Sequence, residues 1–187
     1  MDKNIFSVPN NTRTIDDFKA RLIQGGARPN LFEVEMAFPT EDIFPELGDT
    51  TFRMMIKGAQ LPASNIAEVI VPFRGRQIKI AGDRTYADWT ITVINDTNFK
   101  LRNAFERWSN GINNATDGEG LTNPADYQVD AFVDQLDRNG ATIKSYTLRG
   151  VFPTEIAAIE LDYGTNDAIE EFGVTFAYQY FESNTTT

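Results

Sequence analysis

Residues 71–98 read VPFRGRQIKIAGDRTYADWTITVINDTN. Runs of alternating apolar and polar residues flank a tight, charged turn, and the last run leads directly into a helix-start signal at Asp96 and Thr97. An alternation with a period of two is typical of a β-strand that buries one face. The stretch contains no histidine, no cysteine and no recognisable catalytic pair. We therefore predict ordered β-structure that carries no active site.

The same period of two recurs along most of the chain from residue 31 onward. In residues 31–36, Phe32, Val34 and Met36 share one face. Glycine or proline separates the successive runs, which is typical of antiparallel sheets. Asn139-Gly140 is predicted to form a primed hairpin turn, because Asn-Gly suits the positive φ angles of that turn. The remaining runs lie at 52–57, 66–73, 77–81, 88–94, 127–133, 142–151 and 172–181.

Residues 96–113 instead have the helical period of 3.6 residues, and they are predicted to form one long helix capped by Asp96 or Thr97. Its apolar face consists of Leu101, Phe105, Trp108 and Ile112. A shorter helix is predicted to begin after Thr14 and to end at Gly25-Gly26. This short helix has one narrow apolar stripe, formed by Ile15, Phe18 and Leu22.

Together these elements predict a mainly β fold, an antiparallel β-barrel or sandwich with one long flanking α-helix, a short N-terminal helix and extended terminal arms. The chain of 187 residues is long enough for one domain with an ordinary core. We treat residues 1–187 as that domain, with a polar N-terminal arm at 1–13 and a polar C-terminal tail at 183–187.

The charge balance and the residue types that are missing restrict the function. The chain has 17 basic and 27 acidic residues, and its net charge of −10 argues against sequence-specific nucleic-acid binding. The absence of cysteine and histidine excludes disulfides, thiolate nucleophiles, Cys/His zinc sites and imidazole-based triads. We predict no enzyme, no cofactor, and no catalytic or metal-binding residue. No run reaches the roughly 18 apolar residues of a membrane span and no signal peptide opens the chain, so a cytoplasmic site of synthesis is expected.

Two groups of charged residues are candidates for a binding surface. Glu33 and Glu35 share one face of a strand, and Asp130 lies on the polar face of another. These acids either form the plain solvent face of an antiparallel sheet or line one concave surface. A basic group surrounds the turn of the opening stretch and consists of Arg74, Arg76, Lys79 and Arg84. These side chains are interpreted as solvated, as contacts to phosphate or as contacts to a neighbouring subunit.

Two further functions of other classes stay open from the residues alone. Asp117 and Glu119 lie in a glycine-rich loop, where a calcium site or a metal-dependent carboxylate enzyme is conceivable, although the EF-hand spacing is absent. Tyr178 and Tyr180 lie on one strand face and are candidates for a monomeric β-barrel that binds a small ligand.

The order of several short segments resembles the tail tube proteins of contractile-tail bacteriophages. The similarity covers about residues 20–182, and the order and spacing of the segments make it specific. The segments are RPNLFEV (28–34), KGAQLP (57–62), PFRGR (72–76), IKIAGDR (78–84) and YTLRGVFP (146–153). Related tubes occur in tailocins and in type VI secretion, which remain alternatives to a phage tail.

This resemblance implies a structural subunit that forms hexameric rings, which stack into a hollow tube inside a contractile sheath. It implies a virion protein whose partners are its own copies, the tail sheath, a baseplate or tube initiator, a tail terminator and a tape-measure protein. DNA would pass through the lumen without specific binding. On this basis Glu33, Glu35 and Asp130 are expected to face the lumen. Inter-subunit contacts are expected at residues 39–51 and at the basic turn of residues 74–84.

Overall fold

The computed structural model describes residues 14–22, 25–39 and 49–186. The helices are α1 (Ile15–Arg21), α2 (Asp49–Met55), α3 (Lys100–Ile112) and α4 (Pro124–Tyr127). The first strands are β1 (Phe32–Met36), β2 (Ile56–Ala59), β3 (Ser64–Phe73), β4 (Arg76–Tyr86) and β5 (Trp89–Ile94). The later strands are β6 (Val129–Leu136), β7 (Thr142–Ile156), β8 (Glu171–Ala177) and β9 (Tyr180–Ser183).

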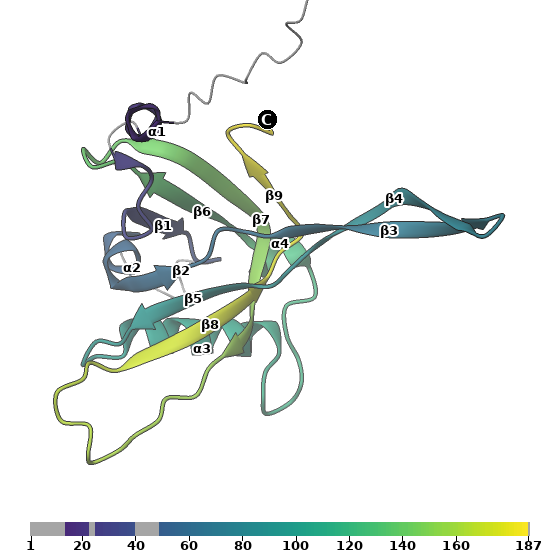
Figure 1. Cartoon of the computed structure of the whole chain (residues 1–187). Helices are drawn as coiled ribbons and strands as arrows, with labels where there is room; N and C mark the ends of the chain where they lie inside the picture. The colour runs from purple at the N-terminus through teal and green to yellow at the C-terminus, as the bar shows by residue number, and fades with distance from the viewer. Residues whose placement is uncertain (1–13, 23–24, 40–48, 187) are drawn as a thin grey trace, which may run out of the picture.

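One antiparallel sheet forms the body of the molecule and runs in the order β1-β6-β7-β8-β5-β2, with β9 paired to β7 (Figure 1). β7 belongs to two layers, since its first part pairs with β6 and β9 and its last part pairs with β8. The layers fold over a shared core, and α2 lies against both β1 and β2, the end strands of this order. The predicted mainly β fold with a long flanking helix is confirmed.

The bend of β7 between the layers coincides with Gly150. This glycine has a φ angle of +66°, which L side chains rarely adopt. A Cβ atom at Gly150 would lie 2.9 Å from Cγ of Gln179 and 3.1 Å from Oε1 of Gln128. The sequence therefore places a residue without a side chain where the strand must both bend and approach its neighbours.

The core between the layers is apolar and rich in aromatic side chains. α3 buries Leu101, Phe105 and Trp108 as its periodicity predicts, whereas Ile112 is only partly buried. The ring of Phe105 contacts those of Phe172 and Phe176 on β8. The other buried apolar residues are Val34, Met36, Phe52, Ile56, Trp89, Ile91, Val93, Ala104, Ala131, Val133, Leu148, Val151 and Val174.

Several polar groups at the margins of this core are hydrogen-bonded. The indole Nε1 of Trp108 donates to the carbonyl oxygen of Tyr127 at 2.9 Å, and that of Trp89 donates to the carbonyl oxygen of Gln60 at 2.7 Å. The long helix begins at Lys100 rather than at residue 96, and its N-cap is Phe99 without a side-chain cap, so the predicted capping by Asp96 or Thr97 is wrong. Oδ1 of Asp96 still accepts from the first helical N–H, that of Lys100, at 2.8 Å. The helix is thus held by the hydrogen bond between Asp96 and its first turn and by the burial of its apolar face.

The structure corrects two of the predicted strands. Residues 52–57 were expected to form a strand, but most of them belong to α2, where Phe52 turns into the core and β2 begins only at Ile56. Residues 172–181 were expected to form one strand, but they divide into β8 and β9, which pair with different parts of β7. Both segments were read from alternation alone, which does not register a break or a change of partner.

The β3–β4 hairpin, residues 64–86, extends away from the body (Figure 1). Its turn has positive φ angles at Arg74 (46°) and Gly75 (79°), as a primed turn requires. The primed turn predicted at Asn139-Gly140 is wrong, since only Gly140 has a positive φ there. Asp137 shapes that turn instead, because its Oδ1 accepts from the backbone N–H groups of Asn139 and Ala141.

Candidate assembly surfaces

Glu33, Glu35 and Asp130 lie on one face of the β1-β6-β7-β9 layer. In the register of β1 and β6, Glu33 is opposite Asp134 and the buried Val34 is opposite the buried Val133. Since side chains alternate across a strand, the carboxylates point away from the core. The sequence predicted this shared polar face, and the register brings the three candidate acids together on it.

The three acids are paired with arginines that sequence reasoning did not assign to them. Nη1 of Arg53, on α2, lies 3.1 Å from Oε1 of Glu33, and Nη2 of the same arginine contacts Glu35. Hydrogen bonding to Glu35 is the largest of the effects that raise the pKa of Arg53, with Glu33 adding to it. Arg53 could not be placed here from sequence, because its segment was read as a strand.

Arg149 on β7 makes the corresponding pair with Asp130. Nη1 of Arg149 lies 2.5 Å from Oδ2 of Asp130, and its Nη2 lies 3.0 Å from Oε2 of Glu182 on β9. These hydrogen bonds, with Asp130 the stronger contributor, raise the pKa of Arg149. We call this surface of the layer the acidic face. Its charged residues are Glu33, Glu35, Asp130, Asp134, Glu182, Arg53 and Arg149.

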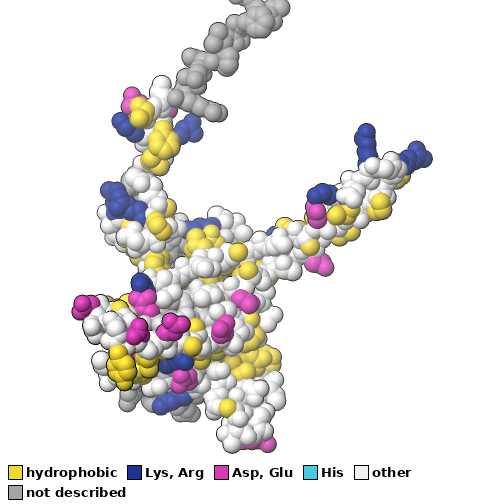
Figure 2. Space-filling model, turned by 60° about the horizontal axis from the view of Figure 1, so that its bottom comes forward, with side chains coloured by type: hydrophobic (Ala, Val, Ile, Leu, Met, Phe, Trp, Pro, Cys, Tyr) yellow, Lys and Arg dark blue, Asp and Glu magenta, His cyan; other side chains and the backbone are white. Residues whose placement is uncertain are grey.

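The β3–β4 hairpin exposes a continuous apolar face. In the antiparallel register Val69 is opposite Ile80, Val71 is opposite Ile78, and Phe73 is opposite Arg76. Cross-strand partners project from the same side of a hairpin, so their side chains form one patch. We call it the hairpin apolar face. Figure 2 shows apolar side chains along the hairpin. The members of this face are between 40% and 57% exposed, and they are Val69, Val71, Phe73, Ile78 and Ile80.

The structure separates the four basic candidates on this hairpin. Arg74 and Arg76 lie together at the tip, where Figure 2 shows basic side chains at the outer end. Lys79 lies on the other face, and its Nζ is 2.8 Å from Oε2 of Glu68. Arg84 is opposite Ile66, beyond a β-bulge and nearer the body. Within residues 14–22, 25–39 and 49–186, neither Arg74 nor Arg76 has an ion-pair partner.

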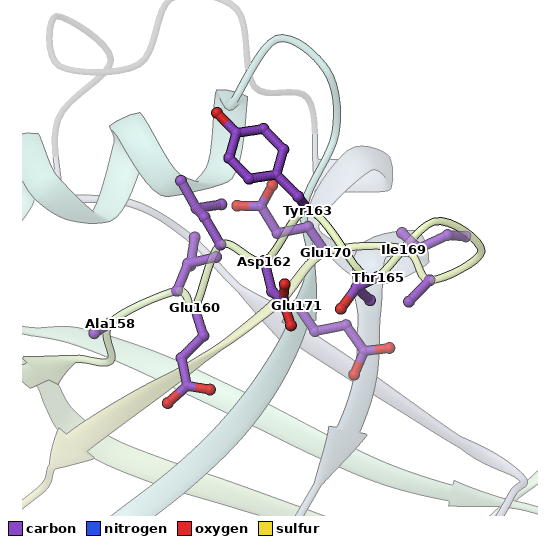
Figure 3. A pocket seen from close by; sticks show the side chains of 11 residues that line it. Ala158, Glu160, Asp162, Tyr163, Thr165, Ile169, Glu170 and Glu171 are labelled. Atoms are coloured by element: carbon purple, nitrogen blue, oxygen red, sulfur yellow. The ribbon is translucent and has the colours of Figure 1, made fainter.

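The loop between β7 and β8, residues 157–170, is a surface that sequence reasoning missed. Leu161 is 86% exposed, Ile169 is 71% exposed, and Tyr163 is fully exposed and projects outward from the loop (Figure 3). The loop surrounds a hollow that is lined by apolar and acidic side chains, among them Glu160 and Asp162. The loop has no periodicity, so the only signal in the sequence is its isolated apolar residues among acids.

Helix α1 also carries an apolar stripe that no described part of the chain covers. Ile15, Phe18 and Leu22, the residues of the predicted apolar stripe, are exposed. Its predicted cap is present, because Oγ1 of Thr14 accepts from the N–H of Asp17 at 3.2 Å and donates to Oδ2 of Asp17 at 2.8 Å. The hydrogen bond from the Thr14 side chain lowers the pKa of Asp17.

The remaining candidates have structural roles or lie elsewhere. Oδ1 of Asp117 accepts from the N–H of Glu119 at 3.1 Å within its loop, and no group of metal-ligating side chains occurs in the part of the chain that the structure describes. The hydroxyl of Tyr178 donates to the carbonyl oxygen of Ala63 at 3.3 Å, and burial raises the pKa of Tyr178. Tyr180 lies apart from it, beside Arg149 on the acidic face.

Two further predictions concern regions outside these surfaces. The proposed contact segment 39–51 falls largely on residues 40–48, which lie outside the described residues. None of the described helices is both long enough and apolar enough to cross a membrane.

Comparisons with known proteins agree with the resemblance of the short segments. The family model for the phage tail tube protein matches residues 27–184. The tail tube protein gp19 of Enterobacteria phage T4 is 36% identical over 172 residues, covering 90% of this chain and 99% of that protein. The tail tube protein of Serratia phage KSP90 is 29% identical over 174 residues, covering 91% and 96%.

Solved structures of contractile assemblies share the fold at low sequence identity. A chain in the anti-feeding prophage baseplate has a TM-score of 0.63 at 13% identity, covering 84% of this chain and 94% of that one. A chain in the PVC sheath–tube complex has a TM-score of 0.59 at 12% identity, covering 88% and 96%. Because the family model spans most of the chain and the T4 relative covers nearly all of it, the chain belongs to the phage tail tube protein family, and it is a structural component of the phage tail rather than an enzyme.

Proposed function

We propose that the protein assembles into hexameric rings that stack into a hollow tube, with the acidic face lining the lumen. The genome passes through this lumen into the host. Membership in the tail tube family sets aside the monomeric ligand-binding barrel and the carboxylate metalloenzyme. Chains of similar fold occur in a baseplate, a sheath–tube complex and a sheath/tube terminator, and we propose such partners, with a tape-measure protein, for this chain.

The observation that carries the lumen proposal is the collection of carboxylates on one face of one layer. Among the described residues, the acidic face holds five carboxylates and two guanidinium groups, a net charge of −3 for each subunit. The paired arginines hold four of these carboxylates, those of Glu33, Glu35, Asp130 and Glu182, but do not neutralise the face. A sheet face that only contacts solvent would not require this excess of negative over positive charge.

An acidic lumen has a clear physical use. DNA phosphates and carboxylates repel one another over a Debye length of about 8–10 Å, so DNA that moves through a narrow acidic channel does not adhere to its wall. Arginines that are each held by carboxylates are less available to phosphate than free arginines, because a competing phosphate would have to break existing charge-assisted hydrogen bonds. The pairs with Arg53 and Arg149 therefore support a wall along which DNA slides.

The β3–β4 hairpin is proposed as a contact between subunits, as predicted for the basic turn. Its apolar face is exposed in the single chain, and contiguous exposed apolar patches typically mark interaction sites. A heterologous contact between identical subunits closes into a ring or continues as a filament, depending on its rotation. Both outcomes are needed for a tube of stacked rings.

Electron microscopy and sedimentation of the purified chain, alone and with tube-initiating baseplate fractions, test the assembly. We expect rings or hollow tubes with sixfold end views. A chain that stays monomeric at high concentration with and without the initiator contradicts the proposal.

The lumen assignment is tested in phage particles that carry Glu33→Lys and Glu35→Lys together. We expect tubes of normal length that deliver DNA poorly, because the wall then attracts phosphate. Asp117→Lys with Glu119→Lys makes the same charge change in an exposed loop outside the acidic face and serves as the matched control. Glu33→Gln with Glu35→Gln removes the same two carboxylates without adding lysines. This variant shows whether losing the ion pairs with Arg53 by itself disturbs folding or tube assembly. Normal infectivity of the lysine variant, with tubes intact, refutes the lumen assignment.

A further inference from the structure

We propose that the tip of the β3–β4 hairpin of one copy docks into the β7–β8 loop, residues 157–170, of a second copy. This inference rests on the proposed tube function and names the surface that accepts the hairpin. The donor is the hairpin apolar face with Arg74 and Arg76. The acceptor is the acidic and apolar hollow of the loop, with Glu160 and Asp162.

The hairpin tip exposes an apolar ring and unpaired positive charges, and no described residue of the same chain covers or pairs with them. Phe73 is 57% exposed, and the guanidinium carbon of Arg74 lies 5.3 Å from the centre of its ring. Arg74 and Arg76 have no ion-pair partner among the described residues, whereas Lys79 on the other face is satisfied by Glu68. Arg84 also has no ion pair among the described residues, but it lies nearer the body, opposite Ile66. The tip therefore holds two uncompensated positive charges beside the hairpin apolar face.

The loop offers the complementary surface. Leu161, Tyr163 and Ile169 are the apolar residues that project from it, and each is more than 70% exposed. Glu160 and Asp162 line the hollow beside them (Figure 3). Among the contacts of the described residues, the carboxylate of Asp162 accepts only from the backbone N–H of Gly164, at 2.8 Å. The hairpin tip and the β7–β8 loop each expose apolar side chains next to charged ones. The charges are positive at the tip and negative at the loop.

The positions of the two surfaces suit a head-to-tail contact. Figure 1 shows the hairpin leaving one side of the body and the β7–β8 loop leaving the opposite side. A copy whose hairpin meets the loop of the next copy leaves its own loop free for another hairpin, which is the definition of a heterologous contact. The loop cannot be filled by the hairpin of the same chain, because the body lies between them.

Other exposed surfaces of the chain are weaker acceptors for the hairpin tip. The stripe of α1 is apolar, but its acidic residues Asp16 and Asp17 are balanced by Lys19 and Arg21 on the same helix. The carboxylates Glu33 and Asp130 of the acidic face are already held by Arg53 and Arg149. Charge complementarity therefore favours the loop.

A charge exchange tests the docking of the hairpin. Arg74→Asp with Arg76→Glu should raise the concentration needed for tube formation at least about tenfold, which corresponds to about 1.4 kcal/mol for each interface between copies. Aspartate is chosen at residue 74 because it tolerates the positive φ found there. Glu160→Lys with Asp162→Lys should weaken assembly to a similar extent. Combining the four substitutions in one chain should return assembly to within about twofold of the wild type, because each charge again meets its opposite.

The matched control replaces the acceptor with another acidic loop. Asp117→Lys with Glu119→Lys adds the same charge as the Glu160/Asp162 variant, and Oδ1 of Asp117 accepts a local backbone N–H just as that of Asp162 does. This pair should not rescue the hairpin variant. Equal rescue by both acidic loops means that only net charge matters and overturns the proposal.

Cysteine cross-linking gives a second test that does not depend on charge. The chain has no cysteine, so Gln77→Cys at the hairpin tip and Thr165→Cys in the loop introduce unique thiols. Under mild oxidation, assembled chains with both substitutions should form a ladder of covalent multimers, and a mixture of the two single variants should stop at dimers. Gln77→Cys with Glu119→Cys is the control. If wild-type tubes form but only the control pair cross-links, the loop is not the acceptor; if no tubes form at all, the proposed function itself fails.

Discussion

The strands β4 and β5 follow one another in the chain and show the same alternation, yet they occupy opposite environments. Ile91 and Val93 of β5 are completely buried in the core, whereas Ile78 and Ile80 of β4 are about half exposed on the hairpin. The alternation therefore specifies a strand and the side that becomes covered. It does not specify whether the covering element comes from the same chain. In the body the apolar face of a strand is covered by the same chain, and on the hairpin it is not. Substitutions in each region can test this difference.

The largest effect is expected from a truncation in the body. Phe105→Ala should lower the free energy of unfolding by about 3–5 kcal/mol, because the ring is completely buried and no other side chain fills its space. Phe105 contacts the rings of Phe38, Phe52, Trp108, Phe172 and Phe176. Urea denaturation of the disassembled chain measures the change. A loss below about 1 kcal/mol would contradict the packing of α3 onto β8.

The bend of β7 should be the next most sensitive position in the body. Gly150→Ala should cost at least about 1–2 kcal/mol, since its φ of +66° is left-handed and the added Cβ meets Gln179 and Gln128. Gly75→Ala is the comparison, because its φ of +79° is similar but nothing lies within 4 Å of the added Cβ. The strain at Gly75 can be relieved by local opening of the hairpin turn. Equal shifts of the global unfolding midpoint for both variants would argue that the hairpin unfolds together with the body.

The body could largely be predicted from the sequence, because most of its elements satisfy their periodicity within the chain. Val34 and Met36 on β1 and Leu101, Phe105 and Trp108 on α3 are buried as predicted. The errors occur where a local pattern has no information about its partners. Residues 52–55 became helical because Phe52 reaches the core from α2, and the alternating run 172–181 breaks because its two parts pair with different segments of β7.

The candidate surfaces could be predicted only in part, for the same reason. The shared face of Glu33, Glu35 and Asp130 follows from alternation within β1 and β6 together with their register. Arg53 and Arg149 could not be assigned to these acids, since ion pairs between distant segments depend on the tertiary fold. The β7–β8 loop has no period at all, so its exposed Leu161 and Tyr163 become visible only in the structure.

A smaller effect is expected at the turn of the β6–β7 hairpin. Asp137→Ala should cost about 0.5–1.5 kcal/mol, because its Oδ1 accepts from the N–H groups of Asn139 at 2.7 Å and Ala141 at 2.9 Å. Asp137→Asn retains an acceptor oxygen and should recover most of the stability. Thermal unfolding of the disassembled chain resolves the difference. If the alanine and asparagine variants unfold at the same temperature as the wild type, the side chain does not hold this turn.

The smallest effect on unfolding, and the sharpest test of the comparison, is expected from Phe73→Ala. Phe73 and Phe105 lose the same ring atoms on truncation, but Phe73 lies on the exposed hairpin apolar face. Its removal should change the unfolding free energy of the disassembled chain by no more than about 0.5 kcal/mol. Assembly should nevertheless weaken by about 1 kcal/mol or more for each interface, measured as a higher concentration for tube formation, because an aromatic residue at the centre of an interface is a typical hot spot. Wild-type assembly by the alanine variant would mean that no neighbouring copy covers the hairpin apolar face. Loss of stability equal to that of Phe105→Ala would mean that the hairpin belongs to the body, and in either case the distinction between the two regions fails.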